Sequence, residues 1–354
     1  MLKDPQRANP PQSAPPPASG APASATAATE SADQELRALL NHLLTAPPEP
    51  QRVPDAAAWW TAHQAAAADS TRSMARAARG GFAADRLGYA FASGYGEALR
   101  RLVPEVPAGP TALAALCATE AGGAHPRSIK TRIAAPDAAS TVSRDGAGWV
   151  LSGRKQFVTF GPLAQTLLVV ATRGTDEAGR SQLVVAHIPA ARPGVLVQAL
   201  PELAFIPEIP HASVELKDVP VAADELLPGD GYERYLKPFR TIEDCHVMAA
   251  LLGWLLQVAR RSDWPRRVLQ EVTMLLVTGL GLAAAPPLDA AVHVALAGWL
   301  ERIEELLGTC RPLWAQVDAQ TRALWERDGS LLLVAGKARS ERLTAAWHKL
   351  APPR

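Results

Sequence analysis

The chain has 354 residues, of which 48% are hydrophobic and 20% charged, and its formal net charge is +1. This composition is typical of a globular protein with two or three packed layers of structure. The balanced charge gives no electrostatic reason to expect nucleic acid or an anionic membrane as a partner. Three cysteines, at positions 117, 245 and 310, form no C-x-x-C pair, so we expect no metal site and no disulfide framework, and a cytoplasmic location.

The first part of the chain predicts a tail followed by helices. Residues 1–30 are dominated by Pro, Ala and Ser and lack the continuous apolar core of a signal peptide, so we predict a disordered tail. Residues 31–108 are rich in Ala and Leu at helical spacing, which predicts an N-terminal helical domain. Ser31 and Gln34 have the pattern of a capping box and predict the start of its first helix.

The middle and C-terminal parts of the chain differ in their hydrophobic patterns. Residues 109–228 contain short runs of Val, Leu, Ile and Thr between turns, with no helical pattern among them, and predict a central antiparallel β-sandwich or barrel. Residues 229–354 predict a C-terminal helical bundle with helices at 232–261, 265–280, 287–308, 312–326 and 330–350. The fold class is therefore α+β and multidomain. The longest apolar stretches of the chain fall short of the roughly 20 uninterrupted apolar residues that a membrane span needs. We therefore expect these stretches to form buried helices and expect no membrane-spanning segment.

Three motifs occur in order on this architecture. They are LCATEAGGAHPRSIKT (116–131), GAGWVLSGRKQFVTFG (146–161) and LKDVPVAADELLPGDG (216–231). Together they resemble the acyl-CoA dehydrogenase family, whose members carry a T-E-P-x-A-G-S-type loop, a hairpin ending in [WF]-I-T-N, and a similar exit from the β-domain. The resemblance implies FAD-dependent oxidation of an acyl-CoA thioester to the 2,3-enoyl-CoA. It also implies an electron-transfer flavoprotein or similar acceptor and a homo-oligomeric assembly.

The hairpin motif contains the residues best placed for a flavin. Alternation along a strand would put Phe157 and Thr159 on one face. By the resemblance, Phe157 would stack on the flavin ring and Thr159 would reach its N5/O4 edge, while Thr119 and the backbone beside it would hold the pyrimidine end. The residues assigned to the ring in this way are Cys117, Ala118, Thr119, Phe157, Val158 and Thr159. The alternative is that Phe157 is buried in an ordinary sandwich core.

The loop that would hold the FAD phosphates departs from the family pattern. Ala121 stands where Pro is usual, and Ala124 and His125 stand where Gly and Ser are usual. The missing Ser would normally bond a phosphate. His125, Arg127 and backbone N–H groups are candidates to replace it, because glycine-rich turns bind anions. The alternative is that His125 is an exposed loop residue.

The expected base is on the first long helix after the β-domain. The family's C-terminal motifs, including the segment with its usual catalytic Glu, are not found, so we expect a shortened and divergent member. Some members carry the base instead ten residues before a Gly on that helix, and Glu243 stands ten residues before Gly253. The resemblance thus assigns Glu243 to take the α-proton while hydride leaves the β-carbon for flavin N5. Apolar neighbours on its helix face would raise its pKa. The alternative is a solvated Glu near a helix N-terminus.

Two other functions stay open at this level. The missing C-terminal motifs favour a degenerate fold of this family that binds a partner or acyl-CoA without redox turnover. A flavin monooxygenase on the same fold would need no base at Glu243. The basic cluster ARRSDWPRR (259–267) either meets the CoA phosphates or faces water.

Overall fold

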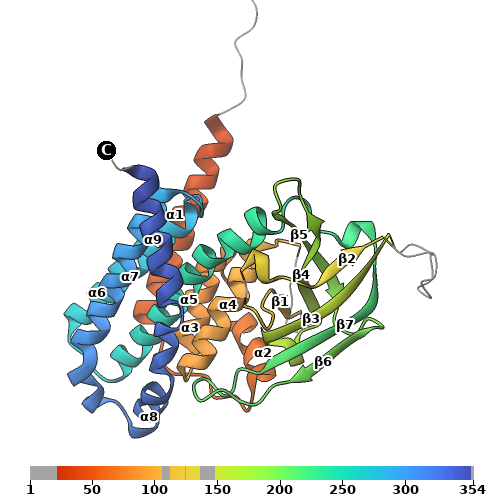
Figure 1. The fold of residues 1–354 in the computed structure, drawn as a ribbon. Helices are drawn as coiled ribbons and strands as arrows, with labels where there is room; N and C mark the ends of the chain where they lie inside the picture. The colour runs from red at the N-terminus through yellow and green to blue at the C-terminus, as the bar shows by residue number, and fades with distance from the viewer. Residues whose placement is uncertain (1–21, 106–111, 124, 136–147, 352–354) are drawn as a thin grey trace, which may run out of the picture.

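The computed structural model describes residues 22–105, 112–123, 125–135 and 148–351. The predicted tail up to residue 21, the predicted boundary at 109 and loop residue Ala124 lie outside these ranges. Helices from both ends of the chain pack together, and the β-domain lies beside them (Figure 1). The predicted order of a helical domain, a β-domain and a helical bundle is confirmed.

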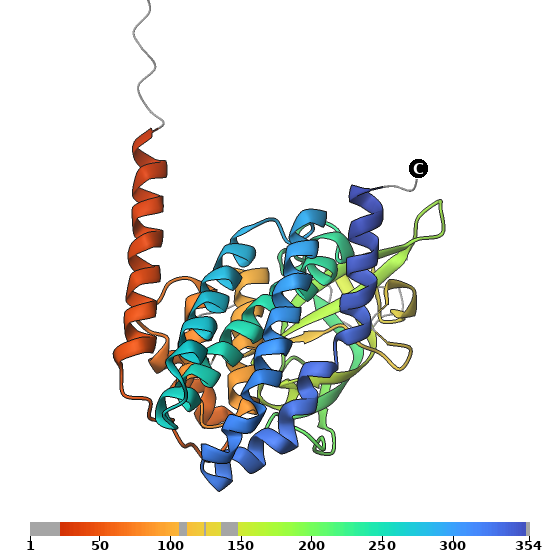
Figure 2. The ribbon, with the colours of Figure 1, turned by 90° about the vertical axis from the view of Figure 1, so that its left-hand side faces the viewer.

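The N-terminal helices are α1 (Pro22–Thr45), α2 (Ala56–Ala66), α3 (Ser73–Ala83) and α4 (Leu87–Leu102). α1 extends beyond the other helices (Figure 2). Its start corrects two expectations: residues 22–30 are helical instead of disordered, and Ser31 lies inside the helix instead of at its N-cap. The physical reason is local, because Ala is the best helix former and Pro is well tolerated in the first turn.

The helix that carries Glu243 is α5 (Lys237–Arg261), which follows a π-helical turn at Tyr232–Leu236. Two glycines bring it into backbone contact with α3. A Cβ on Gly81 would lie 1.8 Å from the Ala250 carbonyl oxygen, and a Cβ on Gly253 would lie 2.2 Å from that of Ala78. Each glycine in a helix costs about 1 kcal/mol relative to Ala. Close contact with the N-terminal helices offsets that cost and fixes the position of α5.

The remaining helices are α6 (Arg266–Ala284), α7 (Ala290–Cys310), α8 (Ala319–Asp328) and α9 (Gly336–Leu350). By length and composition alone, the helical stretch Tyr232–Arg261 and α6 could each cross a membrane. The apolar window of the first is 83% buried inside the protein, which identifies a core helix, whereas that of α6 is 28% buried. α6 therefore buries one side against the bundle and leaves another side uncovered.

The basic cluster joins helix ends. Arg260 donates to the carbonyl oxygens of Leu43 and Ala46 at 2.7 Å each, and so caps the last turn of α1. Arg261 lies 3.2 Å from the carboxylate of Asp318, just before α8. These two arginines are thus committed to intramolecular contacts and hold α5 against its neighbours.

The β-domain has seven strands: β1 (Ala114–Cys117), β2 (Arg132–Ala134), β3 (Trp149–Thr159), β4 (Thr166–Thr175), β5 (Ser181–Pro189), β6 (Val195–Ala199) and β7 (His211–Val221). They form one sheet in the order β1-β4-β2-β3-β7-β6, and β5 pairs with the other edge of β4. The expectation of a purely antiparallel domain is wrong for two pairs, because β1 and β2 both run parallel to β4. The loop between them carries the chain onward in the same direction, so they lie one after the other along β4.

Strand β4 separates two hydrophobic cores. Leu167, Val169 and Ala171 belong to the inner core of the β-domain, whereas Leu168 and Val170 belong to the core shared with the helices. A strand buried on both faces reads as a continuous apolar run. This double burial joins the β-domain to α4 and α5 and positions the candidate site at their junction.

Candidate active site

Strand β3 carries the predicted ring-binding segment at an irregular point. Its pairing with β7 shifts register between Lys155 and Val158. Phe157, at the shift, has φ 53, a left-handed conformation that is unfavourable for a bulky residue. Its side chain is 59% exposed, while the Val158 side chain is buried in the inner core. The alternative of a core location for Phe157 is wrong, and Val158 has only its backbone available to a ligand.

Thr159 lies beside two groups that the sequence patterns did not single out. Its hydroxyl is 3.3 Å from His211 Nε2. Burial lowers the pKa of His211, and Nδ1–H donates to the Ile209 carbonyl at 3.0 Å, so Nε2 is left to accept from the hydroxyl. The second group is the hydroxyl of Tyr95, on α4, which faces the Thr159 side chain.

Tyr95 also connects β1 and β3 to the predicted base. Burial raises the pKa of its phenol far above the usual range, and the nearby Glu243 carboxyl raises it further. The backbone of Leu116 on β1 favours the ionised phenol and so acts in the opposite direction. The ring packs edge-on against Phe239, with centroids 5.9 Å apart. The only sequence signal for Tyr95 is its position between two glycines in an apolar helix.

Glu243 lies half-buried in the second turn of α5. Burial raises its pKa to about 7, and the charge of Asp244 adds to this effect. Arg240 and Arg339 act in the opposite direction. A freely solvated carboxylate would keep a pKa near 4.3. The environment of Glu243 is therefore the one that its apolar neighbours indicated.

Asp244 is held by the last helix of the bundle. Its carboxylate accepts from Arg339 at 2.7 and 2.9 Å and from Arg342 at 2.5 Å. Arg339 also donates to the Leu332 carbonyl at 3.1 Å, just before α9. α9 is thus tied to α5 at the residue next to the predicted base.

The loop between β1 and β2 is held by a buried carboxylate. Glu120 accepts from Lys155 Nζ at 2.7 Å, from the Thr131 hydroxyl at 2.7 Å and from the Lys130 backbone N–H at 2.8 Å. Burial alone would raise the pKa of Glu120, but the Lys155 ammonium and these hydrogen bonds bring it below its usual value. The Gln156 N–H donates to the Thr119 carbonyl at 2.9 Å, so the loop start is also tied to the residue before Phe157.

The other two residues assigned to the ring from this loop have buried side chains. Cys117 is in the inner core and Ala118 is in the core shared with the helices. Only their backbone groups are available to a ligand, as the sequence interpretation required.

A cavity of about 230 Å³ opens beside this loop. Lys130 and Arg154 supply its positive charge, and Gly153 lets the loop approach, because a Cβ there would lie 2.5 Å from the Thr131 hydroxyl. Its lining comprises Glu120, Ala121, Gly122, Ser128, Lys130, Thr131, Gly153, Arg154 and Gln156. Two basic side chains beside a glycine-rich turn make this cavity a candidate anion site, and that combination is the sequence signal that could have located it.

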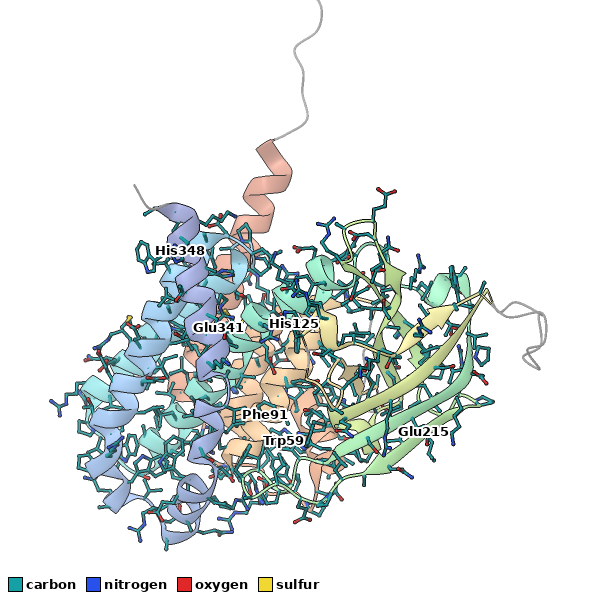
Figure 3. The ribbon with its side chains drawn as sticks, in the orientation of Figure 1. Trp59, Phe91, His125, Glu215, Glu341 and His348 are labelled. Carbon is teal, nitrogen blue, oxygen red and sulfur yellow. The ribbon has the colours of Figure 1, made fainter. Side chains whose placement is uncertain are left out.

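His125 does not belong to that lining. It is exposed on the loop surface, where Figure 3 labels it. Its Nδ1 accepts from the Arg127 N–H at 3.2 Å. The structure brings Thr159 and Glu243 toward Tyr95 and leaves His125 apart.

Known proteins resemble this chain in its middle part and in its fold. The family model described as acyl-CoA dehydrogenase, middle domain, matches residues 115–219. Probable acyl-CoA dehydrogenase FadE2 of Mycobacterium tuberculosis is 30% identical over 95 residues, which is 26% of this chain and 23% of that protein. The match therefore spans less than a quarter of that relative's length.

Two solved structures share the fold over most of their length. The glutaryl-CoA dehydrogenase from Mycobacterium smegmatis in complex with FADH2 has a TM-score of 0.60 and 13% identity, and the alignment covers 91% of this chain and 94% of that one. PigA with FAD and proline has a TM-score of 0.61 and 11% identity, with 90% and 97% covered. Residues 115–219 thus match the acyl-CoA dehydrogenase middle domain, and the chain as a whole shares the fold of such dehydrogenases.

Proposed function

We propose that this protein is an FAD-dependent dehydrogenase that oxidises an acyl-CoA thioester to the 2,3-enoyl-CoA. One observation carries the proposal. The carboxyl of Glu243, with a pKa raised to about 7, lies near enough to the phenol of Tyr95 to raise its pKa, and the Thr159 side chain faces the same phenol. The exposed ring of Phe157 lies two residues before Thr159 on the same strand. We therefore assign Glu243 as the base and the exposed Phe157 as the surface for a flat aromatic ligand.

The residues present fit FAD at both of its ends. Phe157 offers an exposed face for stacking, and Thr159 offers a hydroxyl and a backbone N–H to the ring edge. Lys130 and Arg154 line the loop cavity, and their positive charge suits the phosphates. Bound FAD would supply the hydride acceptor, and the protein would supply its binding and orientation.

The protein's own groups supply the proton chemistry. With a pKa of about 7, Glu243 is a base at slightly alkaline pH and still holds an abstracted proton well. The raised pKa of Tyr95 keeps its hydroxyl protonated, so it can donate a hydrogen bond next to the base. Asp244, paired with Arg339 and Arg342, fixes the helical turn from which Glu243 projects.

Flavin absorbance tests this proposal. The purified protein, reconstituted with FAD, should be yellow and should bleach when an acyl-CoA is added. Glu243→Gln should keep the bound spectrum and lose bleaching by at least a hundredfold in rate, because the general base is gone. Glu233→Gln, at an exposed residue paired only with Lys237, is the matched control and should bleach normally. Protein that takes up no FAD would sink the proposal, and bleaching that persists in Glu243→Gln would assign the base elsewhere.

We also infer a homo-oligomer through the bundle and an electron-transfer flavoprotein or similar acceptor in the cytoplasm. Leu44, Met274 and Val277 are exposed apolar residues on a groove of about 660 Å³ between α1 and α6. An uncovered apolar patch of this kind marks an interaction surface. Met274→Glu should lower the molecular mass found by sedimentation equilibrium, and an unchanged mass would exclude this face.

A further inference from the structure

A second cavity lies among the helices. It has a volume of about 370 Å³ and lies at the start of α3, the end of α4, one face of α5 and the end of α6. None of its lining residues lines the loop cavity beside β3. A volume of this size is at the lower end of the range for small-molecule sites, roughly 300–1,000 Å³.

The cavity has an apolar side and a cationic side. Met74, Leu280 and Ala283 form the apolar side. Arg100 and Arg101, in the last turn of α4, belong to the cationic side. A ligand that uses both sides would combine an apolar segment with an anionic group.

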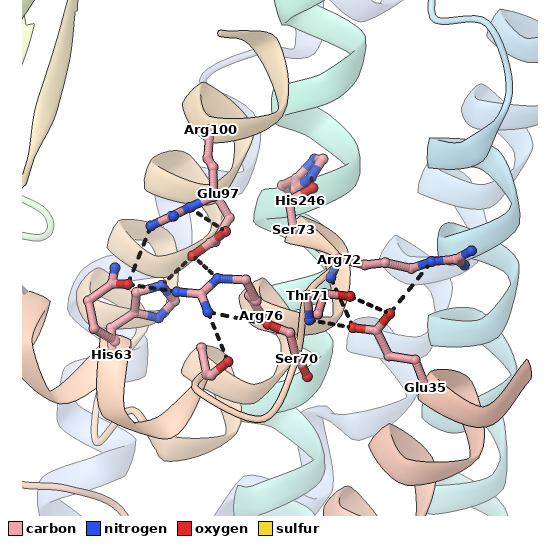
Figure 4. Close-up of polar contacts among 12 residues, drawn as sticks. Glu35, His63, Ser70, Thr71, Arg72, Ser73, Arg76, Glu97, Arg100 and His246 are labelled. Atoms are coloured by element: carbon pink, nitrogen blue, oxygen red, sulfur yellow. Dashed lines mark hydrogen bonds and ion pairs between the residues drawn. The ribbon is translucent and has the colours of Figure 1, made fainter. Parts of the chain in front are cut away.

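The arginines around the cavity outnumber their acidic partners. Glu97, fully buried, accepts from His63 Nε2 at 2.9 Å and from Arg76 Nε at 2.8 Å, and its other oxygen lies 3.2 Å from Arg100 (Figure 4). One carboxylate is thus shared by two arginines. Among the described residues Arg101 has no acidic partner, and its side chain is exposed at the cavity.

The start of α3 adds to the positive potential. Arg72, the N-cap residue, makes no side-chain cap, and its guanidinium lies 3.6 Å from Glu35. The Glu35 carboxylate binds the N–H groups of Thr71 and Arg72, which precede the helix (Figure 4). The N–H groups of the first helical turn, which starts at Ser73 on the cavity wall, are the ones a helix leaves for an outside acceptor.

The polar side chains of Ser73 and His246 on the cavity wall are uncharged and are held in place by hydrogen bonds. His246 Nδ1–H donates to the Ile242 carbonyl at 2.7 Å, so Nε2 accepts from the Ser73 hydroxyl at 2.8 Å. Burial lowers the pKa of His246 to about 4, and the ring is uncharged at neutral pH. The histidine therefore neither attracts nor repels an anion, and the charge selectivity belongs to the arginines.

We propose that this cavity binds a small carboxylate with a short unbranched apolar chain. The carboxylate pairs with Arg101 and the first turn of α3, and the chain lies on Met74, Leu280 and Ala283. Binding at this site requires no flavin, so it is independent of the proposed dehydrogenase reaction.

Isothermal titration of the full chain with hexanoate tests the proposal, with acetate and hexanol as comparators. Hexanoate should bind at least tenfold more tightly than acetate, which lacks the chain, and than hexanol, which lacks the charge. Arg101→Ala should weaken hexanoate binding at least tenfold, and this exposed residue can be replaced without loss of fold. Arg154→Ala, in the loop cavity, is the matched control and should leave the affinity unchanged. Equal binding to Arg101→Ala and the unaltered protein would overturn the proposal, and so would loss of binding in Arg154→Ala or equal affinity for acetate.

Discussion

The β-domain and the helical bundle each contain one buried carboxylate with basic partners beside the candidate site. Glu120 pairs with Lys155 and holds the loop between β1 and β2. Asp244 pairs with Arg339 and Arg342 and holds α9 against α5. The first pair joins two of the sequence motifs across 35 positions, whereas the second joins residues 95 and 98 positions apart. A buried ion pair therefore comes from recognisable sequence motifs in the β-domain. In the bundle it comes from a contact between helices that are distant in the sequence.

The largest expected effect is in the β-domain. Lys155→Met removes the ammonium and leaves the Glu120 carboxylate buried without its cation. Breaking a buried pair in this way costs about 3–5 kcal/mol. Urea unfolding should show this loss, and adding Glu120→Gln to Lys155→Met should recover part of it. A loss below about 1 kcal/mol in the single variant would mean that the pair does not hold the loop.

The corresponding change in the bundle should be smaller. Asp244→Asn leaves Arg339 and Arg342 without a carboxylate, but their side chains are 18% and 14% exposed and keep some water. We expect a loss of about 2–3 kcal/mol in urea unfolding. Asp244 also raises the pKa of Glu243, while Arg339 lowers it. Bleaching by acyl-CoA should therefore begin at a lower pH in Asp244→Asn, and an onset at higher pH would contradict this account.

The sequence contains more signals for candidate site residues in the β-domain than in the helices. The F-x-T segment was correctly separated from ordinary core because two further motifs accompanied it. Its geometry was not predictable, because the left-handed Phe157 arises from a register shift with β7. Alternation along one strand contains no information about the pairing of a partner strand. For the same reason the parallel pairing of β1 and β2 with β4 was missed.

The helical part depends on contacts that no local pattern records. Tyr95 comes near Glu243 only after α4 and α5 pack together, and Asp244 pairs with α9 only after the bundle closes. The spacing that selected Glu243 was taken from one helix alone, and its assignment as the base stays a prediction. Helix periodicity predicts which face a residue occupies, but not which helix covers that face. The start of α1 shows the same limit, because a composition typical of disorder also contains good helix formers.

A third, smaller effect is the pH dependence of the unfolding free energy that the raised pKa of Glu243 causes. Its pKa is about 7 in the folded state and 4.5 in the reference state, so the folded protein binds the proton more tightly. The stability from this proton is fully present below pH 4.5 and is lost as pH rises through 7. Between pH 5 and pH 8 the unaltered protein should lose about 1–2 kcal/mol of unfolding free energy that Glu243→Gln does not lose. Urea unfolding at the two pH values checks this, with Glu233→Gln expected to behave like the unaltered protein. An identical pH dependence in Glu243→Gln would show that burial does not hold the proton.

The smallest expected change in stability is at Phe157. Its side chain is 59% exposed, so Phe157→Ala should alter the free energy of unfolding by less than about 0.5 kcal/mol. Val158→Ala, on the next residue with a side chain buried in the inner core, should cost about 1–2 kcal/mol because it leaves a cavity. The order should reverse for FAD retained after gel filtration: Phe157→Ala should lose most of it, since the stacking face is gone, and Val158→Ala should keep it. If Phe157→Ala lost stability and kept FAD, the bulge would be a structural feature of the sheet and not the wall of a flavin site.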